Sequence, residues 1–462
     1  MRRSCTLVIS ILLFNGMNSL AQVLTLRAAL DSALAHYGTI QAKKEYLRSA
    51  EAQAKGVRLQ YLPDINVGAE QVYGSANGMF GPLYPGRVPA VSSGGPVFPD
   101  QRWNSAFGAL YLANVNWDLF TFGRVQAARQ LAVAQVQLGA LDLEQEKFQH
   151  QVRVAGTYMN LLAAQRLRIS QQRNLDRAMT LRTVVSARAR SGLIAGVDSS
   201  LANAEVSNAR TALNNAINVE NELNSQLAQY MGAPDHPYLL DTMLLARSPI
   251  SMQDTAINPA AHPLLRYYQS RVEASREQEK FFNRSIMPVV SLFGVIQGRG
   301  SGFGSKYSIL YPNDYTHDYW SGINPRTSNY VMGLGLSWNV MSPFKWRQQV
   351  ASQQFVSRGL EEELRLVDTK LRAQMVLADQ NIVNALANRQ EAPLQWKAAS
   401  DAYLQKSKLY ENGLTNMVDL TQTLYALNRA ETNREIANNN VWQALLFKAA
   451  ATGDITLLLS QL

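Results

Sequence analysis

The stretch Gly192-Leu-Ile-Ala-Gly-Val-Asp198 returns 221 residues later as Gly413-Leu-Thr-Asn-Met-Val-Asp419. Trp117 and Trp338 stand at the same separation, and each closes a run in which apolar residues alternate with other residues. Two further pairs keep an offset of 225 residues: Gly38 with Pro263, and Pro63 with Pro288. Anchors that keep their order and spacing over half the chain indicate an internal duplication. The sequence therefore predicts two copies of one unit of roughly two hundred residues.

The N-terminus predicts an export signal. Two arginines precede an apolar run from Leu7 to Phe14, and a small-residue cleavage site ends at Ala21. This run is too short to span a bilayer, so residues 1–21 are assigned to a signal peptide. Cys5 is the only cysteine and lies within this segment. The exported chain is therefore expected to have no disulfide and no cysteine-based metal site.

Composition and charge narrow the class of protein. Of the 462 residues 47% are hydrophobic and 17% are charged, as in ordinary folded chains. The formal net charge of +9 is spread along the chain, so nucleic-acid binding is not expected. Outside the signal, no stretch reaches eighteen apolar residues. If this chain crosses a membrane, it must do so as a β-barrel.

The first copy, residues 22–231, predicts helices followed by a long hairpin. Helices are expected over Leu26 to Leu34 and Ile40 to Gln60, because no proline occurs before Pro63. Strands are expected at about residues 64–73 and 107–117, since in each run one face is apolar and the other is largely polar. At about ten residues, each strand has the length that a tilted strand needs to cross a bilayer.

A long helix follows the hairpin. Residues 125–190 contain no proline, and apolar residues recur there every seven positions: Ala134, Leu141, Phe148, Ala155, Leu162 and Ile169. This spacing is typical of a coiled-coil face. After the Gly192 turn, a second helix is expected from Val197 to Met231.

The second copy, residues 263–453, repeats this order. Helices are expected over 264–285, 344–410 and 418–451, and strands at about 289–298 and 330–339. The glycines of Gly298-Arg-Gly-Ser-Gly302 are assigned to a loop, and a kink is expected at Pro393. Residues 232–262 are interpreted as a linker and 454–462 as a C-terminal tail.

Four strands cannot close a membrane barrel, because the smallest have about eight and open edges are not tolerated in lipid. The chain is therefore expected to oligomerise. Two copies would leave little lumen, whereas three would supply twelve strands around a channel. The fold class is thus mainly α with membrane β, and the long helices would continue the cylinder as a tube.

The duplicated helix–strand–strand–helix unit, its breaks at Pro63 and Pro288, and the paired Gly-Leu-x-x-x-Val-Asp turns resemble the outer-membrane factor (TolC-like) family. The resemblance implies a homotrimer with a twelve-stranded β-barrel in the outer membrane and a long α-helical barrel in the periplasm. It also implies an exit channel for efflux pumps or type I secretion that docks a periplasmic adaptor and an inner-membrane transporter.

The resemblance also suggests site residues. It implies that Asp419 forms an acidic ring at the periplasmic pore constriction, with Gln422 and Asp198 nearby. The alternative for both aspartates is a helix N-cap, with Asp419 and Gln422 as a capping box. Gly192-Leu193 and Gly413-Leu414 would be turns facing the adaptor, or simply helix stops. Trp117 and Trp338 are assigned to a membrane-interface belt, with a core position as the alternative.

No catalytic site, cofactor or metal site is expected. The five histidines have no ligand spacing, and the sequence contains no nucleophile elbow, phosphate loop or paired-carboxylate motif. A periplasmic coiled-coil adaptor or scaffold without a pore is the alternative function. It would account for the helices but not for the four alternating runs.

Overall fold

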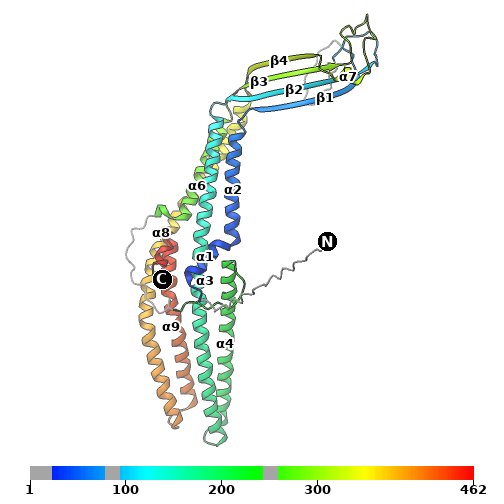
Figure 1. Cartoon of the computed structure of the whole chain (residues 1–462). Helices are drawn as coiled ribbons and strands as arrows, with labels where there is room; N and C mark the ends of the chain where they lie inside the picture. Colours follow the sequence, from blue (N-terminus) through cyan, green and yellow to red (C-terminus); the bar gives the residue numbers. More distant parts are fainter. Residues whose placement is uncertain (1–22, 79–93, 243–258, 462) are drawn as a thin grey trace, which may run out of the picture. The chain divides into compact units, whose positions relative to one another are not determined.

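The computed structural model describes residues 23–78, 94–242 and 259–461. The predicted signal peptide, part of the first loop and part of the linker lie outside these ranges. In the first copy the elements, drawn in Figure 1, are α1 (Leu26–His36), α2 (Gly38–Leu59), β1 (Asp64–Ser75), β2 (Ser105–Phe120), α3 (Arg124–Arg190) and α4 (Gly196–Met231). Those of the second copy are η1 (Pro259–Ala261), α6 (Pro263–Arg284), β3 (Val289–Ser301), α7 (Tyr319–Ile323), β4 (Thr327–Ser337), α8 (Ser342–Glu411), α9 (Met417–Thr452) and α10 (Thr456–Leu459).

The four strands form one antiparallel sheet in the order β1-β2-β3-β4 (Figure 1). The register brings the predicted apolar runs onto one face, because Val67 pairs with Ala113, which pairs with Ile296, which pairs with Tyr330. Two neighbouring rows of the opposite face contain the polar residues Asn66, Asn114, Gln297 and Asn329, together with Gly68 and the apolar residues Leu112, Val295 and Val331. Polar residues thus gather on one face, although apolar residues interrupt it.

Both outer strands leave an edge open. Within the described chain β1 pairs only with β2, and β4 pairs only with β3. The apolar face is uncovered over much of its length, with Ile65 71% and Val67 82% exposed. A single protomer therefore ends in a sheet with two unpaired edges and an exposed apolar surface.

The strand bounds correct one expectation. Gly298 to Ser301 belong to β3, which runs three residues beyond the predicted end, and a short helix, α7, follows within the connection to β4. The assignment of Gly298-Arg-Gly-Ser-Gly302 wholly to a loop was therefore wrong. Glycine weakens a strand, yet Gly298 and Gly300 keep their ladder pairs with Tyr111 and Ala109.

The chain folds into two compact units that differ from the two sequence copies. Of the described residues, one unit contains 23–47, 139–242, 259–270 and 361–461, and the other contains 48–78, 94–138 and 271–360. Each unit thus combines parts of both copies. The second unit contains the sheet, and the first contains both Gly-Leu turns and the main apolar core.

The main core lies where α1, α3, α4, α9 and α10 meet. Its most buried large side chains include Trp442, Tyr158, Met159 and Leu227. The seven-residue pattern of α3 is confirmed over most of its length, because Ala134, Leu141, Phe148, Ala155 and Leu162 are all buried, while Ile169 is 37% exposed. Leu458 of α10 is fully buried, so the segment predicted as a tail contributes to this core.

The second long helix, α8, continues from Ser342 to Glu411 with Pro393 inside it. The proline therefore does not end the helix. Among the described helices, none combines the length and the apolar character needed to span a bilayer.

Candidate functional site

The two repeated turns have the same backbone structure. At the end of α3, the Leu193 N–H donates to the Arg188 carbonyl and the Gly192 N–H donates to the Ala189 carbonyl. At the end of α8, Leu414 and Gly413 make the matching bonds to the carbonyls of Leu409 and Tyr410. These are Schellman motifs, which need a left-handed residue after the helix. Gly192 (φ 71°) and Gly413 (φ 73°) supply it, so both glycines do stop helices.

Each turn also presents apolar side chains to solvent. Leu193 is 69% exposed and Leu414 is 73% exposed, and Val197 and Val418 at the start of the following helices are similarly open. Helix stops require the glycines but do not require exposed leucines. The adaptor-facing role of Gly192-Leu193 and Gly413-Leu414 therefore remains a prediction, and the exposed Val197 and Val418 lie beside these turns.

Arg188 joins the two turns. Its Nη1 donates to the Tyr410 carbonyl at 2.6 Å and, more weakly, to the Glu411 carbonyl at 3.4 Å, and its guanidinium lies 5.5 Å from the centre of the Tyr410 ring. These carbonyls belong to the last turn of α8, where a positive charge is favourable. The end of the first copy's long helix thus caps the end of the second copy's long helix.

Asp419 lies in the first turn of α9 but is not its N-cap. The N-cap is Asn416, whose side chain accepts a hydrogen bond from the Asp419 N–H at 2.8 Å. The Asp419 carboxylate accepts from Lys406 Nζ at 2.9 Å and from Thr415 Oγ1 at 3.1 Å. The hydrogen bond from Lys406, then that from Thr415, lowers the pKa of Asp419. The carboxylate is therefore ionised, and part of its charge is balanced within the protomer.

The N-cap interpretation was also wrong for Asp198. The N-cap of α4 is Ala195, which has no capping side chain, and Asp198 follows three residues later. Asp198 lies near Tyr410, and its charge adds to burial in raising the pKa of that hydroxyl. Gln422 is exposed one turn after Asp419. Asp198 and Asp419 therefore occupy matching positions beside the bridged turns.

Trp117 and Trp338 also match between the copies. The Trp117 indole N–H donates to the Tyr61 carbonyl at 3.0 Å, and that of Trp338 donates to the Ile286 carbonyl at 3.1 Å. Each acceptor stands two residues before the proline that separates helix from strand. Both indoles are partly exposed, at 38% and 52%. They are therefore not core residues. An amphipathic ring fixed by its polar end is typical of an interface.

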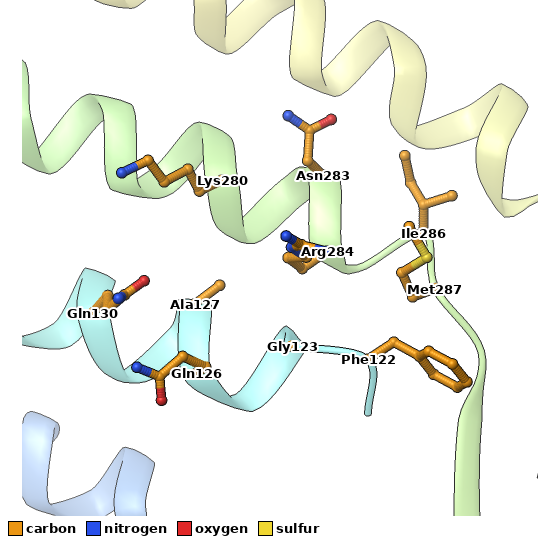
Figure 2. Close-up of a pocket in the computed structure, with 10 residues that line it drawn as sticks. All are labelled: Phe122, Gly123, Gln126, Ala127, Gln130, Lys280, Asn283, Arg284, Ile286 and Met287. Atoms are coloured by element: carbon orange, nitrogen blue, oxygen red, sulfur yellow. The ribbon is translucent and has the colours of Figure 1, made fainter. Parts of the chain in front are cut away.

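A pocket of about 600 Å³, missed by sequence reasoning, lies between the start of α3 and the end of α6 (Figure 2). It is lined by Phe122, Gly123, Gln126, Ala127, Gln130, Lys280, Asn283, Arg284, Ile286 and Met287. Lys280 is paired with Glu277 at 2.6 Å, and the Arg284 side chain covers Gly123. The pocket thus carries a basic rim beside the carbonyl that holds Trp338.

Sequence reasoning also missed Arg188, Lys406 and Asn416. Asn416 was detectable as a second candidate, because asparagine is as favourable at an N-cap as aspartate. Arg188 and Lys406 gave no local signal, since their partners lie on other helices. Among the described residues, no group of three or more His, Cys, Asp or Glu side chains is arranged to hold a metal ion.

Part of the chain matches a known family model. Residues 29–233 match the family model described as "Outer membrane efflux protein". Curated protein sequences give no match. Solved structures match along nearly the whole chain, at identities that establish the fold alone. The CmeC outer membrane channel of Campylobacter jejuni is 11% identical with a TM-score of 0.75, covering 93% of this chain and 85% of CmeC.

Two further channel structures agree. The outer membrane protein VceC of Vibrio cholerae is 14% identical, with a TM-score of 0.71 and coverage of 93% of this chain and 96% of VceC. The open state of the MtrE outer membrane channel of Neisseria gonorrhoeae is 14% identical, with a TM-score of 0.70 and coverage of 93% and 89%. Residues 29–233 are thus similar in sequence to the outer membrane efflux protein family, and the whole chain shares the fold of these outer-membrane structures.

Proposed function

We propose that three copies of this chain form a passive exit duct through the outer membrane for a tripartite efflux pump or a type I secretion system. The observation that carries the proposal is the four-stranded sheet, which has one exposed apolar face, one more polar face and two open edges. Joining β4 of one protomer to β1 of the next satisfies both edges, and three protomers give twelve strands. Lipid then contacts the apolar face, and water fills the lumen on the other side.

The second long helix supports the same assembly. Along α8 many apolar side chains are more than half exposed in the single protomer: Phe344, Phe355, Leu366, Val376, Val383, Leu394 and Leu404. A helix with this surface needs a partner. In the proposed trimer, helices of the neighbouring protomers cover these side chains and close the tube.

At the repeated turns we propose contact with a periplasmic adaptor, which in turn joins the channel to an inner-membrane transporter. Support comes from the exposed Leu193, Val197, Leu414 and Val418, which form small apolar surfaces beside helix ends closed by backbone hydrogen bonds. Helical hairpins pack on such surfaces. Energy is then supplied by the transporter, and the duct itself catalyses no reaction.

Asp419 is proposed as the acidic ring of the pore constriction, with Asp198 and Gln422 beside it. A threefold axis would bring three ionised carboxylates together, and these attract cations. Lys406 moderates this charge because it pairs with Asp419 in each protomer. The ring is therefore expected to select cations weakly rather than strongly.

Conductance of the purified protein in planar bilayers tests the duct. Wild-type protein is expected to give open-channel currents, and Asp419→Asn to shift the reversal potential in a salt gradient towards that of an unselective pore. The matched control is Asp454→Asn, at an exposed aspartate beyond α9, which should leave the reversal potential unchanged. A protein that never conducts would favour the pore-free scaffold, and an unchanged reversal potential in Asp419→Asn would remove the ring.

Docking is tested separately. Leu193→Ser combined with Leu414→Ser should conduct normally in bilayers yet fail to restore the susceptibility profile of a deletion strain. Val219→Ser, at an exposed position in the body of α4, is the control and should restore it. Full restoration by the double variant would exclude these leucines from the adaptor contact.

A further inference from the structure

We propose that residues 318–325, which include α7, form an aromatic anchor that lies on the lipid-facing side of the sheet and binds the headgroup region of the outer leaflet. This inference rests on the proposed function, which makes the apolar face of the sheet the one in contact with lipid. The partner is a lipid surface. The segment was not predicted from the sequence, which gave only a loop there.

The glycines at the end of β3 show which face of the sheet α7 covers. Side chains alternate along a strand, so Gly298 and Gly300 share the apolar face with Ile296. A Cβ atom on Gly300 would lie 2.6 Å from the Gly322 carbonyl oxygen and 2.9 Å from that of Asn324. A Cβ atom on Gly298 would lie 3.5 Å from the Pro325 ring. The segment therefore lies against the apolar face.

This packing explains why glycines recur at the end of β3, a feature for which the proposed duct gives no reason. Because Gly300 has no side chain, the backbone of 322–324 approaches the sheet more closely than any other residue would permit. Gly322 makes the reciprocal approach, since a Cβ there would lie 2.4 Å from Phe107 Cβ. Gly322 and Ile323 are buried. The segment is thus seated on the sheet and is not a free loop.

The outward side of the segment is aromatic. The Tyr319 ring lies between Phe107, with centroids 5.1 Å apart, and Trp320, with centroids 5.3 Å apart. The Tyr319 hydroxyl donates to Gln71 Oε1 at 2.8 Å, which ties the segment to β1. Trp320 itself is 72% exposed. A tryptophan held at the surface by a fixed neighbour matches the composition of membrane interfaces.

The position of the segment 318–325 along the strands fits the far border of the apolar band. Trp117, in the predicted belt at the other end, pairs with Leu292, eight residues before Gly300. At about 3.3 Å per residue this is about 26 Å of strand, or roughly 20 Å of depth for a strand tilted by about 40°. Outer-membrane barrels have an apolar band about 25 Å tall between two aromatic girdles. Trp117 and Trp338 would then belong to one girdle, and Tyr319 and Trp320 to the other.

Site-directed fluorescence quenching tests the anchor. The only cysteine, Cys5, lies in the predicted signal peptide, so an introduced cysteine is the single thiol of the exported chain. Trp320→Cys, Ile296→Cys and Gln297→Cys are each labelled with an environment-sensitive fluorophore. The full-length proteins are reconstituted in vesicles of phosphatidylethanolamine and phosphatidylglycerol. Part of the lipid carries bromine either near the headgroup or near the chain end, which quenches probes at that depth.

Three results are expected. The probe at position 320 loses most of its fluorescence to bromine near the headgroup, and the probe at 296 loses most to bromine near the chain end. The probe at 297, one residue further on the opposite face, is quenched by neither. If 296 is quenched and 320 is not, or if 320 is quenched only from the chain end, the anchor is refuted and the duct stands. If 296 is not quenched, the lipid-facing sheet and the proposed duct are refuted together.

Discussion

At the scale of single residues, His262 shows how a fixed hydrogen-bond pattern determines a protonation state. Its Nδ1 accepts from the Leu264 N–H at 3.1 Å, and its Nε2 donates to the Ala450 carbonyl at 3.1 Å. A second proton would place an N–H donor against an N–H donor in a buried site. Burial accordingly lowers the pKa of His262 below its ordinary value of 6.5. Burial lowers the pKa of His150 in the same way, where the ring stacks on Tyr37.

These histidines predict a loss of stability in mild acid. A buried histidine with a lowered pKa is neutral in both the folded and the unfolded chain above about pH 6.5, the pKa of histidine in the unfolded chain, so its protonation costs no folding stability there. Below this pH the unfolded chain takes up the proton first. Each such histidine then lowers the free energy of unfolding by up to about 1.4 kcal/mol per pH unit until the pKa of the folded state is reached. His262→Gln removes the titrating ring but can still donate to the Ala450 carbonyl, so its unfolding temperature should fall less between neutral and mildly acid pH than that of the wild type. The control is His36→Gln, at an exposed position, and equal slopes for wild type and His262→Gln would contradict the prediction.

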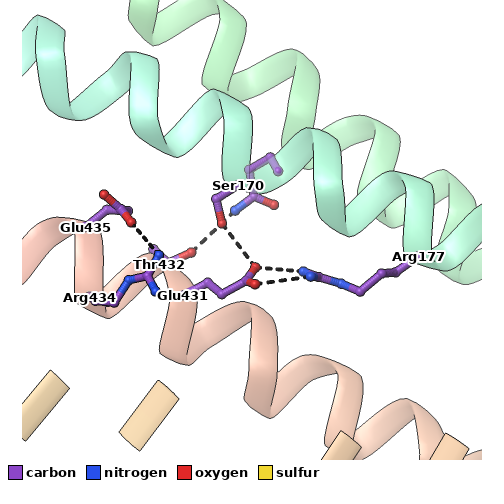
Figure 3. Close-up of polar contacts among 7 residues, drawn as sticks. Ser170, Arg177, Glu431, Thr432, Arg434 and Glu435 are labelled. Atoms are coloured by element: carbon purple, nitrogen blue, oxygen red, sulfur yellow. Dashed lines mark hydrogen bonds and ion pairs between the residues drawn. The ribbon is translucent and has the colours of Figure 1, made fainter. Parts of the chain in front are cut away.

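At the scale of elements, a buried ion pair joins α3 of the first copy to α9 of the second (Figure 3). Arg177 donates to both carboxylate oxygens of Glu431, at 3.1 Å and 2.7 Å, and the Ser170 hydroxyl lies 3.4 Å from the same carboxylate. The two-pronged geometry fixes the register of one helix against the other. The side chains are 22% and 11% exposed, so the charges depend on each other for solvation.

Removing one member of this pair is expected to destabilise the protein strongly. Glu431→Leu leaves the partly buried Arg177 without its counter-charge, which costs about 2 kcal/mol of unfolding free energy. Adding Arg177→Met should recover much of this loss, because two apolar side chains then replace two charges. Denaturant unfolding of the detergent-solubilised variants measures both the loss in Glu431→Leu and the recovery in the double variant. Arg372→Met breaks the exposed pair with Asp368 and should leave the free energy of unfolding nearly unchanged. If Glu431→Leu costs no more than this control, the pair does not hold α3 against α9.

At the scale of the whole molecule, the proposed duct closes the two open edges of the sheet against neighbouring protomers. β4 of one protomer would lie antiparallel to β1 of the next protomer, as do all neighbouring strands within the sheet. The joint would also continue the two faces around the cylinder. In the proposed duct, a single protomer would leave the backbone hydrogen-bonding groups of both edges unpaired in lipid, where no water can bind them.

Disulfide scanning tests this joint. One cysteine replaces Ala69 on the apolar face of β1, and a second replaces in turn each residue of β4 on the same face, from Ser328 to Leu336. At least one combination should give covalent trimers on oxidation, because facing Cβ atoms in a ladder come within disulfide range. The same Ala69 cysteine combined with Asn329 or Val331 on the other face should remain uncrosslinked. If no combination crosslinks in the membrane, β1 and β4 are not neighbours.

The amino-acid sequence by itself determined the repeated order of helices and strands, the apolar face of each strand and the two glycine turns. These follow from local physics: a period of two or of seven, a proline that ends a helix, and a glycine that adopts positive φ. The helix caps were mistaken at Asp198 and Asp419 because several polar residues compete within one turn, and only their geometry distinguishes them.

Only the tertiary structure decided which distant groups meet. Arg188 donates a hydrogen bond to the Tyr410 carbonyl, Arg177 pairs with Glu431, and the Gly322 backbone packs against Gly300. Each contact depends on how one packed element is rotated and shifted against another, and no spacing along the chain encodes that. The glycine-rich end of β3 is the clearest case, since the same five residues suit a loop or a strand until the segment that packs on them is known.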